Sequence, residues 1–266
     1  MFQALKRIFA QADEVALPAI PAGERVYAVG DIHGRHDLFG ALVLAIDADD
    51  ADREPADTTV VLLGDLVDRG PGSAQVIALA REWQARRRVR ILAGNHEEMF
   101  LRSFKSLETF RHFLRHGGRE TVISYGIDRA AFGHAELEEA QQMMRAAVPD
   151  EDVAFLKSFE DMIAIGDYLF VHAGIDPRVP IEEQKVHDLR WIREPFLSHA
   201  EHHGQVVVHG HTITDEPEDC GNRIGIDTGA FMTGRLTALV LEGTGRRYLE
   251  AAEGDEGAIA VAPLAV

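Results

Sequence analysis

The chain has 266 residues, of which 46% are hydrophobic, and its formal net charge is −17 at pH 7. This length suits one large α/β domain or two small ones, and the apolar content is sufficient for a buried core. The negative charge repels polyanions, so we expect no nucleic-acid polymer as a partner. A dense arginine cluster at positions 86, 87, 88 and 90 is best interpreted as a solvated helix end, with a polyanion contact as the alternative.

Cys220 is the sole cysteine, which excludes an internal disulfide and a zinc-thiolate cluster. The first fifteen residues lack the apolar core and cleavage pattern of a secretory signal. No window approaches the roughly 18 apolar residues of a membrane span. We therefore expect a cytoplasmic protein with no membrane partner, and a monomer, because no long apolar run suggests an obligate interface.

Short apolar runs alternate with helical patterns along the first part of the chain. Runs of this length that are nearly continuous predict buried strands, and they occupy residues 25–29, 58–63, 89–93, 168–171 and 205–208. Amphipathic patterns predict helices over 36–46 and 72–87, and mainly helical structure over 97–159. After residue 211 the pattern favours strands, at 223–226, 236–241 and 246–251. Strand–helix alternation of this kind predicts an α/β layered fold.

Polar residues follow the predicted strands, where loops at the carboxyl ends of an open α/β sheet converge on one crevice. They are Asp31 with His33, Asp65 with Asp68, Asn95 with His96, His172, and His211. Oxygen ligands mixed with imidazoles suit manganese, iron or zinc. A carboxylate can bridge two such cations, and two cations together can clamp an in-line displacement at phosphorus.

Five motifs occur in order: GDIHG at 30–34, GDLVDRG at 64–70, GNHE at 94–97, HAG at 172–174 and GHT at 210–212. Each motif alone is weak, but the ordered set, across about residues 25 to 240, resembles the phosphoprotein phosphatase (PPP) family of calcineurin-like metallophosphoesterases. The chain is most similar to the bacterial and phage serine/threonine phosphatases of that family. The resemblance implies a metallo-dependent phosphatase fold, in which two mixed β-sheets pack as a sandwich flanked by helices. We expect this domain over 25–252, an N-terminal extension over 1–24 and a loosely packed C-terminal tail over 253–266.

The resemblance also implies the ligands of two metal ions. Asp31 and His33 would bind the first metal, and Asp65 would bridge to the second. The second metal would be completed by Asn95, His172 and His211. In the wider superfamily a second histidine commonly follows in Gly-His-x-His, but here that position is Ile213, which cannot ligate a metal and favours the PPP branch.

The same resemblance implies the groups that act on the substrate. His96, oriented by Asp68, would be the general acid. The residues that would bind the phosphoryl group are Arg69, Asn95 and Arg193, and Arg190 competes with Arg193 for its role.

Plainer interpretations exist for several of these residues. Asp31 and Asp65 could cap helices, since aspartate is favoured at that position. Arg193 could be a surface arginine that pairs with Glu194. We interpret His209 as structural and Asp227 as a hydrogen-bonding brace for the last motif. The loop at 116–119 supplies a helix-capping glycine, and it could also border the substrate cleft.

The expected function is a dimetal phosphomonoesterase that removes phosphate from phosphoserine and phosphothreonine by attack of a metal-bridging hydroxide. The expected cofactors are two divalent metal ions, manganese first, with iron or zinc as alternatives. The expected partner is a phosphoprotein or phosphopeptide. A symmetrical dinucleoside tetraphosphate hydrolase is the alternative, which would make nucleotide polyphosphates the partners, although the 7% aromatic content mildly disfavours base stacking. A non-catalytic scaffold is a further alternative, but no ligand position is lost.

Overall fold

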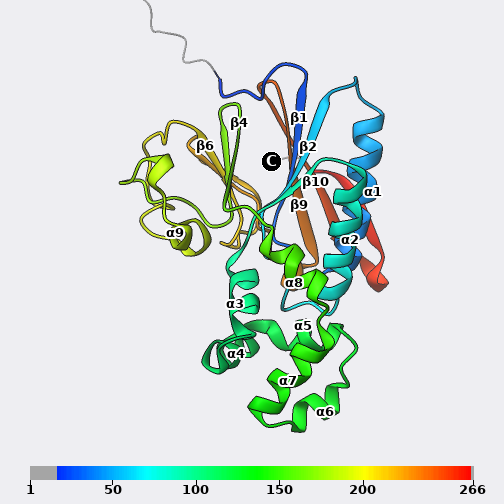
Figure 1. Ribbon diagram of the computed structural model, residues 1–266. Helices are drawn as coiled ribbons and strands as arrows, with labels where there is room; N and C mark the ends of the chain where they lie inside the picture. Colours follow the sequence, from blue (N-terminus) through cyan, green and yellow to red (C-terminus); the bar gives the residue numbers. More distant parts are fainter. Residues whose placement is uncertain (1–16, 265–266) are drawn as a thin grey trace, which may run out of the picture.

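The computed structural model describes residues 17–264, which form two mixed β-sheets that face each other, with helices outside them (Figure 1). The predicted α/β sandwich of two mixed sheets is confirmed. Over the described range no helix is both long enough and apolar enough to cross a membrane.

The first sheet has three parallel strands at one side and three antiparallel strands at the other. Its order is β11 (Ile259–Leu264), β10 (Gly245–Glu253), β9 (Arg235–Glu242), β1 (Glu24–Val29), β2 (Asp57–Leu62) and β3 (Val89–Ile91). Strand β1 is buried on both faces, because Val26 and Ala28 pack toward the second sheet while Tyr27 and Val29 pack toward the helices. This alternation explains why the strand is almost uniformly apolar.

Helices α1 (His36–Ala51) and α2 (Ser73–Arg86) cover the outer face of the first sheet (Figure 1). Their apolar stripes, including Phe39 and Trp83, join the core on that side. The arginine cluster after α2 is neutralised by carboxylates, as Arg87 pairs with Asp47 at 2.5 Å and Arg88 with Asp57 at 2.8 Å. These pairs support the interpretation of the cluster as a helix end.

The second sheet has the order β4 (Met162–Ile165), β5 (Tyr168–Val171), β6 (Val206–His209), β8 (Arg223–Gly225) and β7 (Glu218–Asp219). Strands β5, β6 and β8 are parallel, and β4 and β7 are antiparallel to their neighbours. Helix α9 (Val186–Trp191) lies outside this sheet (Figure 1). Leu189 and Phe196 pack on the outer face of the second sheet, against Leu169 and Val207.

A helical insert separates β3 from β4 and lies beyond one end of the sheets (Figure 1). It contains α3 (Asn95–Ser103), α4 (Leu107–Phe113), a π-helical turn (Leu114–Gly118), α5 (Arg119–Ser124), α6 (Arg129–His134), α7 (Leu137–Ala147) and α8 (Asp150–Lys157). Its two ends meet at β3: the Ala93 N–H donates to the Glu160 carbonyl, and the Glu160 N–H donates to the Ile91 carbonyl, both at 2.8 Å. We call these contacts the neck of the insert.

The C-terminal segment differs from the prediction of a loosely packed tail. After a short 3-10 turn (Asp255–Gly257), strand β11 pairs with β10 along its whole length, from Glu253↔Ile259 to Tyr248↔Leu264. The prediction missed this strand because glycine, alanine and proline obscure its half-buried alternation. At the other end, residues 1–16 of the expected extension lie outside the described residues, and Ile20 is buried in the core between the sheets.

Further short elements connect the strands of the second half. They are a 3-10 turn (Ile181–Glu183) before α9 and helix α10 (Ala230–Thr233) between β8 and β9.

Candidate active site

The predicted site residues gather at the carboxyl ends of β1, β2, β3, β5 and β6, in the space between the two sheets and above the insert. All three aspartates and all four histidines of the motifs are buried, with at most 9% of each residue exposed. Side chains from both sheets therefore reach one buried centre, as the strand-end positions predicted.

The loops that carry these side chains have unusual backbone geometry. Of the six non-glycine residues with positive φ in the described chain, five belong to the motifs: His33, Asp65, Asp68, Arg69 and His211. Left-handed backbone is costly for such residues and persists only where surrounding contacts impose it. The concentration of strain here indicates that the loops are shaped for the placement of side chains.

Two motif glycines are required because the backbone at these positions passes very close to a carboxylate. A Cβ atom on Gly94 would lie 2.1 Å from Asp65 Oδ1, and one on Gly210 would lie 2.0 Å from Asp31 Oδ1. Any side chain at either position would displace a carboxylate, so glycine is needed for the backbone to approach it.

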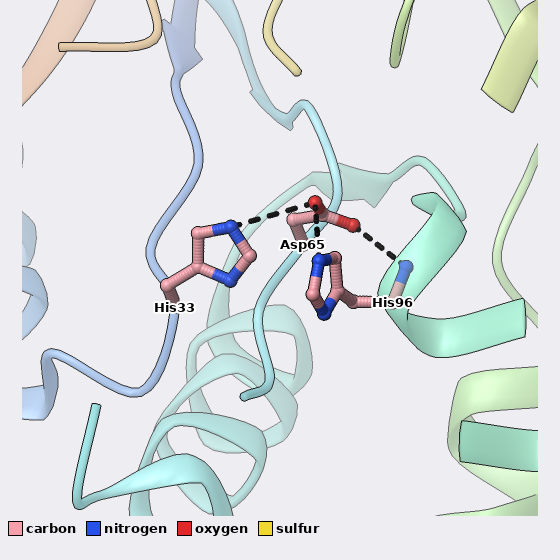
Figure 2. A group of neighbouring side chains, drawn as sticks. All are labelled: His33, Asp65 and His96. Carbon is pink, nitrogen blue, oxygen red and sulfur yellow. Dashed lines mark hydrogen bonds and ion pairs between the residues drawn. The ribbon is translucent and has the colours of Figure 1, made fainter. Parts of the chain in front are cut away.

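Asp65 lies at the centre of the site, and Figure 2 shows His33 and His96 next to its carboxylate. Asp65 Oδ2 is 3.5 Å from His33 Nε2, and Asp65 Oδ1 is 3.5 Å from His172 Nε2. Burial by itself would raise the pKa of Asp65, but the surrounding histidines outweigh it and hold that pKa below its usual range. One carboxylate thus faces two separate groups of nitrogen ligands, as a bridging ligand must.

The second group is formed by Asn95, His172 and His211. The Asn95 amide oxygen is 3.0 Å from His172 Nε2 and 2.9 Å from His211 Nδ1. With Asp65, the two histidines can place their donor atoms within 4.8 Å of one another. These four residues could hold one cation between them.

The first group contains Asp31, His33 and Asp65. Asp31 Oδ2 accepts the N–H of His211 at 3.0 Å, whereas Asp31 Oδ1 is buried without a hydrogen-bond partner among the described residues. Burial and the neighbouring charges of Asp227 and Asp65 raise the pKa of Asp31. A buried carboxylate oxygen with no donor calls for a cation.

The orientation and the neutral state of His33, His172 and His211 are those expected of metal ligands. His33 Nδ1 faces the Val67 carbonyl and His172 Nδ1 faces the Leu63 carbonyl, each at 2.8 Å, which turns both Nε2 atoms toward Asp65. Burial lowers the pKa of both rings and lowers the pKa of His211 to about 3. Neutral imidazoles held by backbone carbonyls are the form that binds metal ions, so the residues present fit two divalent cations.

His96 differs from the other histidines in its partners. Its Nδ1 is 2.6 Å from Asp68 Oδ2, while Thr121 donates to the other oxygen of Asp68 at 2.6 Å. Burial lowers the pKa of His96, but Asp65 and Asp68 outweigh it, so the net pKa is raised. His96 Nε2 lies 3.9 Å from Asp65 Oδ2 and 3.1 Å from Arg69 Nη2, at the inner edge of the site. An imidazole paired in this way can deliver a proton from Nε2.

The two candidate phosphate-binding arginines have different partners in the structure. Arg190 is held by Asp161 at 2.6 Å and by Glu98 at 3.4 Å. Within residues 17–264 Arg193 has no carboxylate partner, and its Nη2 lies 3.5 Å from the His211 carbonyl oxygen. Arg193 is therefore the arginine that remains available at the site, together with Arg69.

Three supporting residues were missed in the sequence analysis. Glu97 accepts the backbone N–H groups of Asp65 at 2.9 Å and Leu66 at 2.7 Å, and burial and Asp65 raise its pKa to about 7. Phe231 lies 4.5 Å below the Arg69 guanidinium and fixes its plane. Glu97 belongs to the GNHE motif and could have been found there, whereas Phe231 and Thr121 carry no sequence signal.

The structure also bears on three secondary interpretations. Asp227 accepts the Gly229 N–H at 2.9 Å, a bond within its own turn, and its role as a brace for the last motif stays a prediction. His209 Nδ1 contacts the Gly210 carbonyl at 3.1 Å, which agrees with a structural role. The 116–119 loop reaches the site, because the Gly117 carbonyl accepts the Arg69 N–H at 3.1 Å.

Two facing mixed sheets with buried aspartates and histidines at their shared edge define a metallophosphoesterase, and this chain belongs to the calcineurin-like phosphoesterase family, whose pattern matches residues 24–230. The chain is 29% identical to the asymmetrical bis(5'-nucleosyl)-tetraphosphatase PrpE of Anoxybacillus flavithermus, over 79% of this chain and 88% of the relative. It is 30% identical to serine/threonine-protein phosphatase 1 of Salmonella typhimurium, over 80% and 89%. A candidate diadenosine tetraphosphatase of known structure shares the fold with a TM-score of 0.60 at 21% identity, over 93% of this chain and 98% of that chain.

Proposed function

We propose that this metallophosphoesterase breaks a phosphorus–oxygen bond by in-line attack of water, with His96 as the proton donor. The observation that carries the proposal is Asp65, which faces nitrogen ligands on both sides, with the His96–Asp68 pair beside it. The proposed ligands are Asp31, His33, Asp65, Asn95, His172 and His211. Two divalent cations held there, manganese first and iron or zinc next, would make water nucleophilic at neutral pH and offset phosphoryl charge.

The remaining residues would bind and orient the substrate. Arg69, fixed over Phe231, and Arg193 offer forked donors to the phosphoryl oxygens, and the Asn95 amide adds a further polar contact. The attacking water loses one proton to solvent, and its oxygen bonds to phosphorus while the opposite phosphorus–oxygen bond breaks. The departing oxygen takes the proton from His96 Nε2, and Asp68 stabilises the imidazolium and holds the ring.

Two substrate classes fit this reaction. Similarity to the Salmonella protein phosphatase supports phosphoserine and phosphothreonine in proteins. Similarity to the tetraphosphatases supports dinucleoside tetraphosphates, and the names of those relatives specify asymmetrical cleavage, whereas the sequence motifs suggested the symmetrical reaction. The cytoplasmic location and the monomeric state stay predictions.

The reaction is tested on protein stripped of metal and then supplied with manganese. Phosphate release is measured from an aryl phosphate, a serine/threonine phosphopeptide panel and diadenosine tetraphosphate. Manganese-dependent hydrolysis of any of these supports the proposed reaction, and the relative values of kcat/KM identify the substrate class. Protein that binds two metals yet leaves even the aryl phosphate intact would contradict the proposal.

A further inference from the structure

A cavity of about 500 Å³ lies between the helical insert and the end of α9. Its walls come from α3, α4, the π-helical turn and the end of α9, and its main lining residues are Glu98, Arg102, Arg111, His112, Arg115 and Trp191. Two of these walls contain residues that are close in sequence to residues of the candidate site. Glu98 follows His96 by two residues on α3, and Arg115 precedes Gly117, whose carbonyl binds the Arg69 backbone. The cavity and the candidate site are therefore joined by short stretches of chain on α3 and on the π-helical turn.

The cavity carries arginines that nothing in the described structure neutralises. Most arginines in residues 17–264 pair with a carboxylate, including exposed ones such as Arg88 and Arg129. Those with no carboxylate within 4.0 Å are Arg69, Arg111, Arg115, Arg119, Arg145 and Arg193. Two of the six lie at the candidate site and two line the cavity. In a chain with a net charge of −17, this grouping leaves local positive charge beside the site.

The acidic residues of the cavity cancel only part of this charge. Glu98 is already engaged by Arg102 at 2.7 Å, by Arg190 at 3.4 Å and by the Trp191 indole N–H at 3.3 Å. Glu108, in the first turn of α4, is the other carboxylate of the lining. Arg111 and Arg115 are exposed on the same wall, four residues apart, so both guanidinium groups can reach one ligand.

Trp191 gives the cavity a flat aromatic surface. Its indole N–H is fixed by Glu98, and its ring stacks with His187 at 6.2 Å with an interplanar angle of 18°. A half-buried indole held in this way is suited to stacking on a planar ligand, because aromatic stacking tolerates many bases.

We propose that this cavity binds the leaving group of a nucleoside polyphosphate, with Arg111 and Arg115 on its phosphates and Trp191 against its base. The inference rests on the proposed phosphoester hydrolysis. Water loses one proton to solvent as its oxygen bonds to phosphorus, and the P–O–P bridge breaks. The released nucleoside phosphate carries the bridging oxygen with the proton of His96, and His96 regains a proton from solvent. A phosphoserine residue leaves as a neutral hydroxyl, which does not need two unpaired arginines.

Kinetics of an Arg111→Gln/Arg115→Gln variant test the proposal. We expect kcat/KM for diadenosine tetraphosphate to fall about ten- to a hundredfold, because two charge-assisted contacts are lost. Hydrolysis of p-nitrophenyl phosphate, which has no group long enough to fill the cavity, should stay within about twofold. Arg86→Gln/Arg88→Gln removes the same charge far from the cavity, near the start of β3, and should leave both substrates unchanged.

The outcomes separate this inference from the proposed reaction. An equal fall on both substrates, no fall on either, or a fall confined to acidic phosphopeptides would overturn the nucleotide assignment. So would wild-type protein that hydrolyses the aryl phosphate but not the dinucleotide. Failure of wild type on every ester would contradict the proposed reaction instead, and the cavity would then be judged by binding alone.

Tryptophan fluorescence can be used to measure nucleotide binding in the cavity. The chain has two tryptophans, and Trp83 is fully buried, so Trp191 is the indole that a nucleotide can reach. We expect ATP to quench tryptophan fluorescence in wild type with manganese present and not in Trp191→Phe. The Arg111→Gln/Arg115→Gln variant should require about tenfold more ATP. Quenching that persists unchanged in Trp191→Phe, or no quenching in wild type, would overturn the proposed stacking.

Discussion

The strand-end loops and the helical insert meet at the site, but they are built in opposite ways. In the loops, side chains are buried, the backbone is held in left-handed conformations, and the N–H groups of Asp65 and Leu66 are bound by the carboxylate of Glu97 at the start of α3. On the insert, Arg111 and Arg115 lie exposed on helices and contact no carboxylate in the described chain. The difference indicates that the geometry of the reaction is imposed by the fold, whereas recognition of the substrate depends on side chains that can be exchanged.

The largest loss of activity should follow substitution of a buried residue in the strand-end loops. His211→Ala removes a proposed ligand, and we expect activity to fall about a thousandfold or more, because bound metal supplies several kcal/mol of stabilisation to the transition state. Metal content and the rise in Tm on addition of manganese should fall together. His209→Ala is the matched control, two residues away and also buried, and it should retain metal. Full metal content in His211→Ala would remove His211 from the ligand set.

The next effect should depend on the leaving group. His96→Ala removes the proton donor, and we expect kcat for a serine phosphopeptide or an alkyl phosphate to fall about a hundred- to ten-thousandfold. An activated aryl phosphate needs little protonation and should lose much less. A steady-state comparison of the two esters measures the ratio. If both fall equally, His96 acts in some way other than proton donation.

A smaller effect should distinguish the two arginines near α9. Arg193→Ala should lower kcat/KM for an aryl phosphate by about ten- to a hundredfold, since a charge-assisted contact to the phosphoryl group is lost. Arg190→Ala should change it by less than about threefold, because Arg190 is already paired with Asp161 and Glu98. The reverse order would transfer the phosphate-binding role to Arg190.

The smallest loss of activity is expected for a substitution at the contact between the strand-end loops and the helical insert. Gly117 has φ of 102°, and a Cβ atom there would lie 2.7 Å from both Cγ and the backbone nitrogen of Arg69. Gly117→Ala should displace Arg69 and lower kcat by about tenfold. Gly126→Ala is the control, because Gly126 also has positive φ but nothing lies within 4 Å of its Cβ position. Each variant should lose about 1 kcal/mol of unfolding free energy, and equal activities would show that Gly117 does not position Arg69.

The sequence allowed the buried region to be predicted much better than the exposed one. Asp31, Asp65, His172 and His211 could be found because each follows an apolar run at the point where a strand must end. The choice of Arg193 over Arg190 required the ion pairs of the folded chain. The cavity could not be predicted, because its residues come from four elements brought together only by packing. Strand β11 was missed because its alanines and its proline obscure the half-buried alternation.

The neck of the insert has a consequence for how such a protein can change during evolution. The chain leaves β3 and returns to it at Glu160, so some sixty residues open and close at one point of the sheet. Beyond α3, this segment can lengthen, shorten or be replaced while the strand register on either side is preserved. A lineage could therefore acquire a new substrate by exchange of the segment and keep the reaction, provided that Gly117 and Thr121 retain their contacts with Arg69 and Asp68.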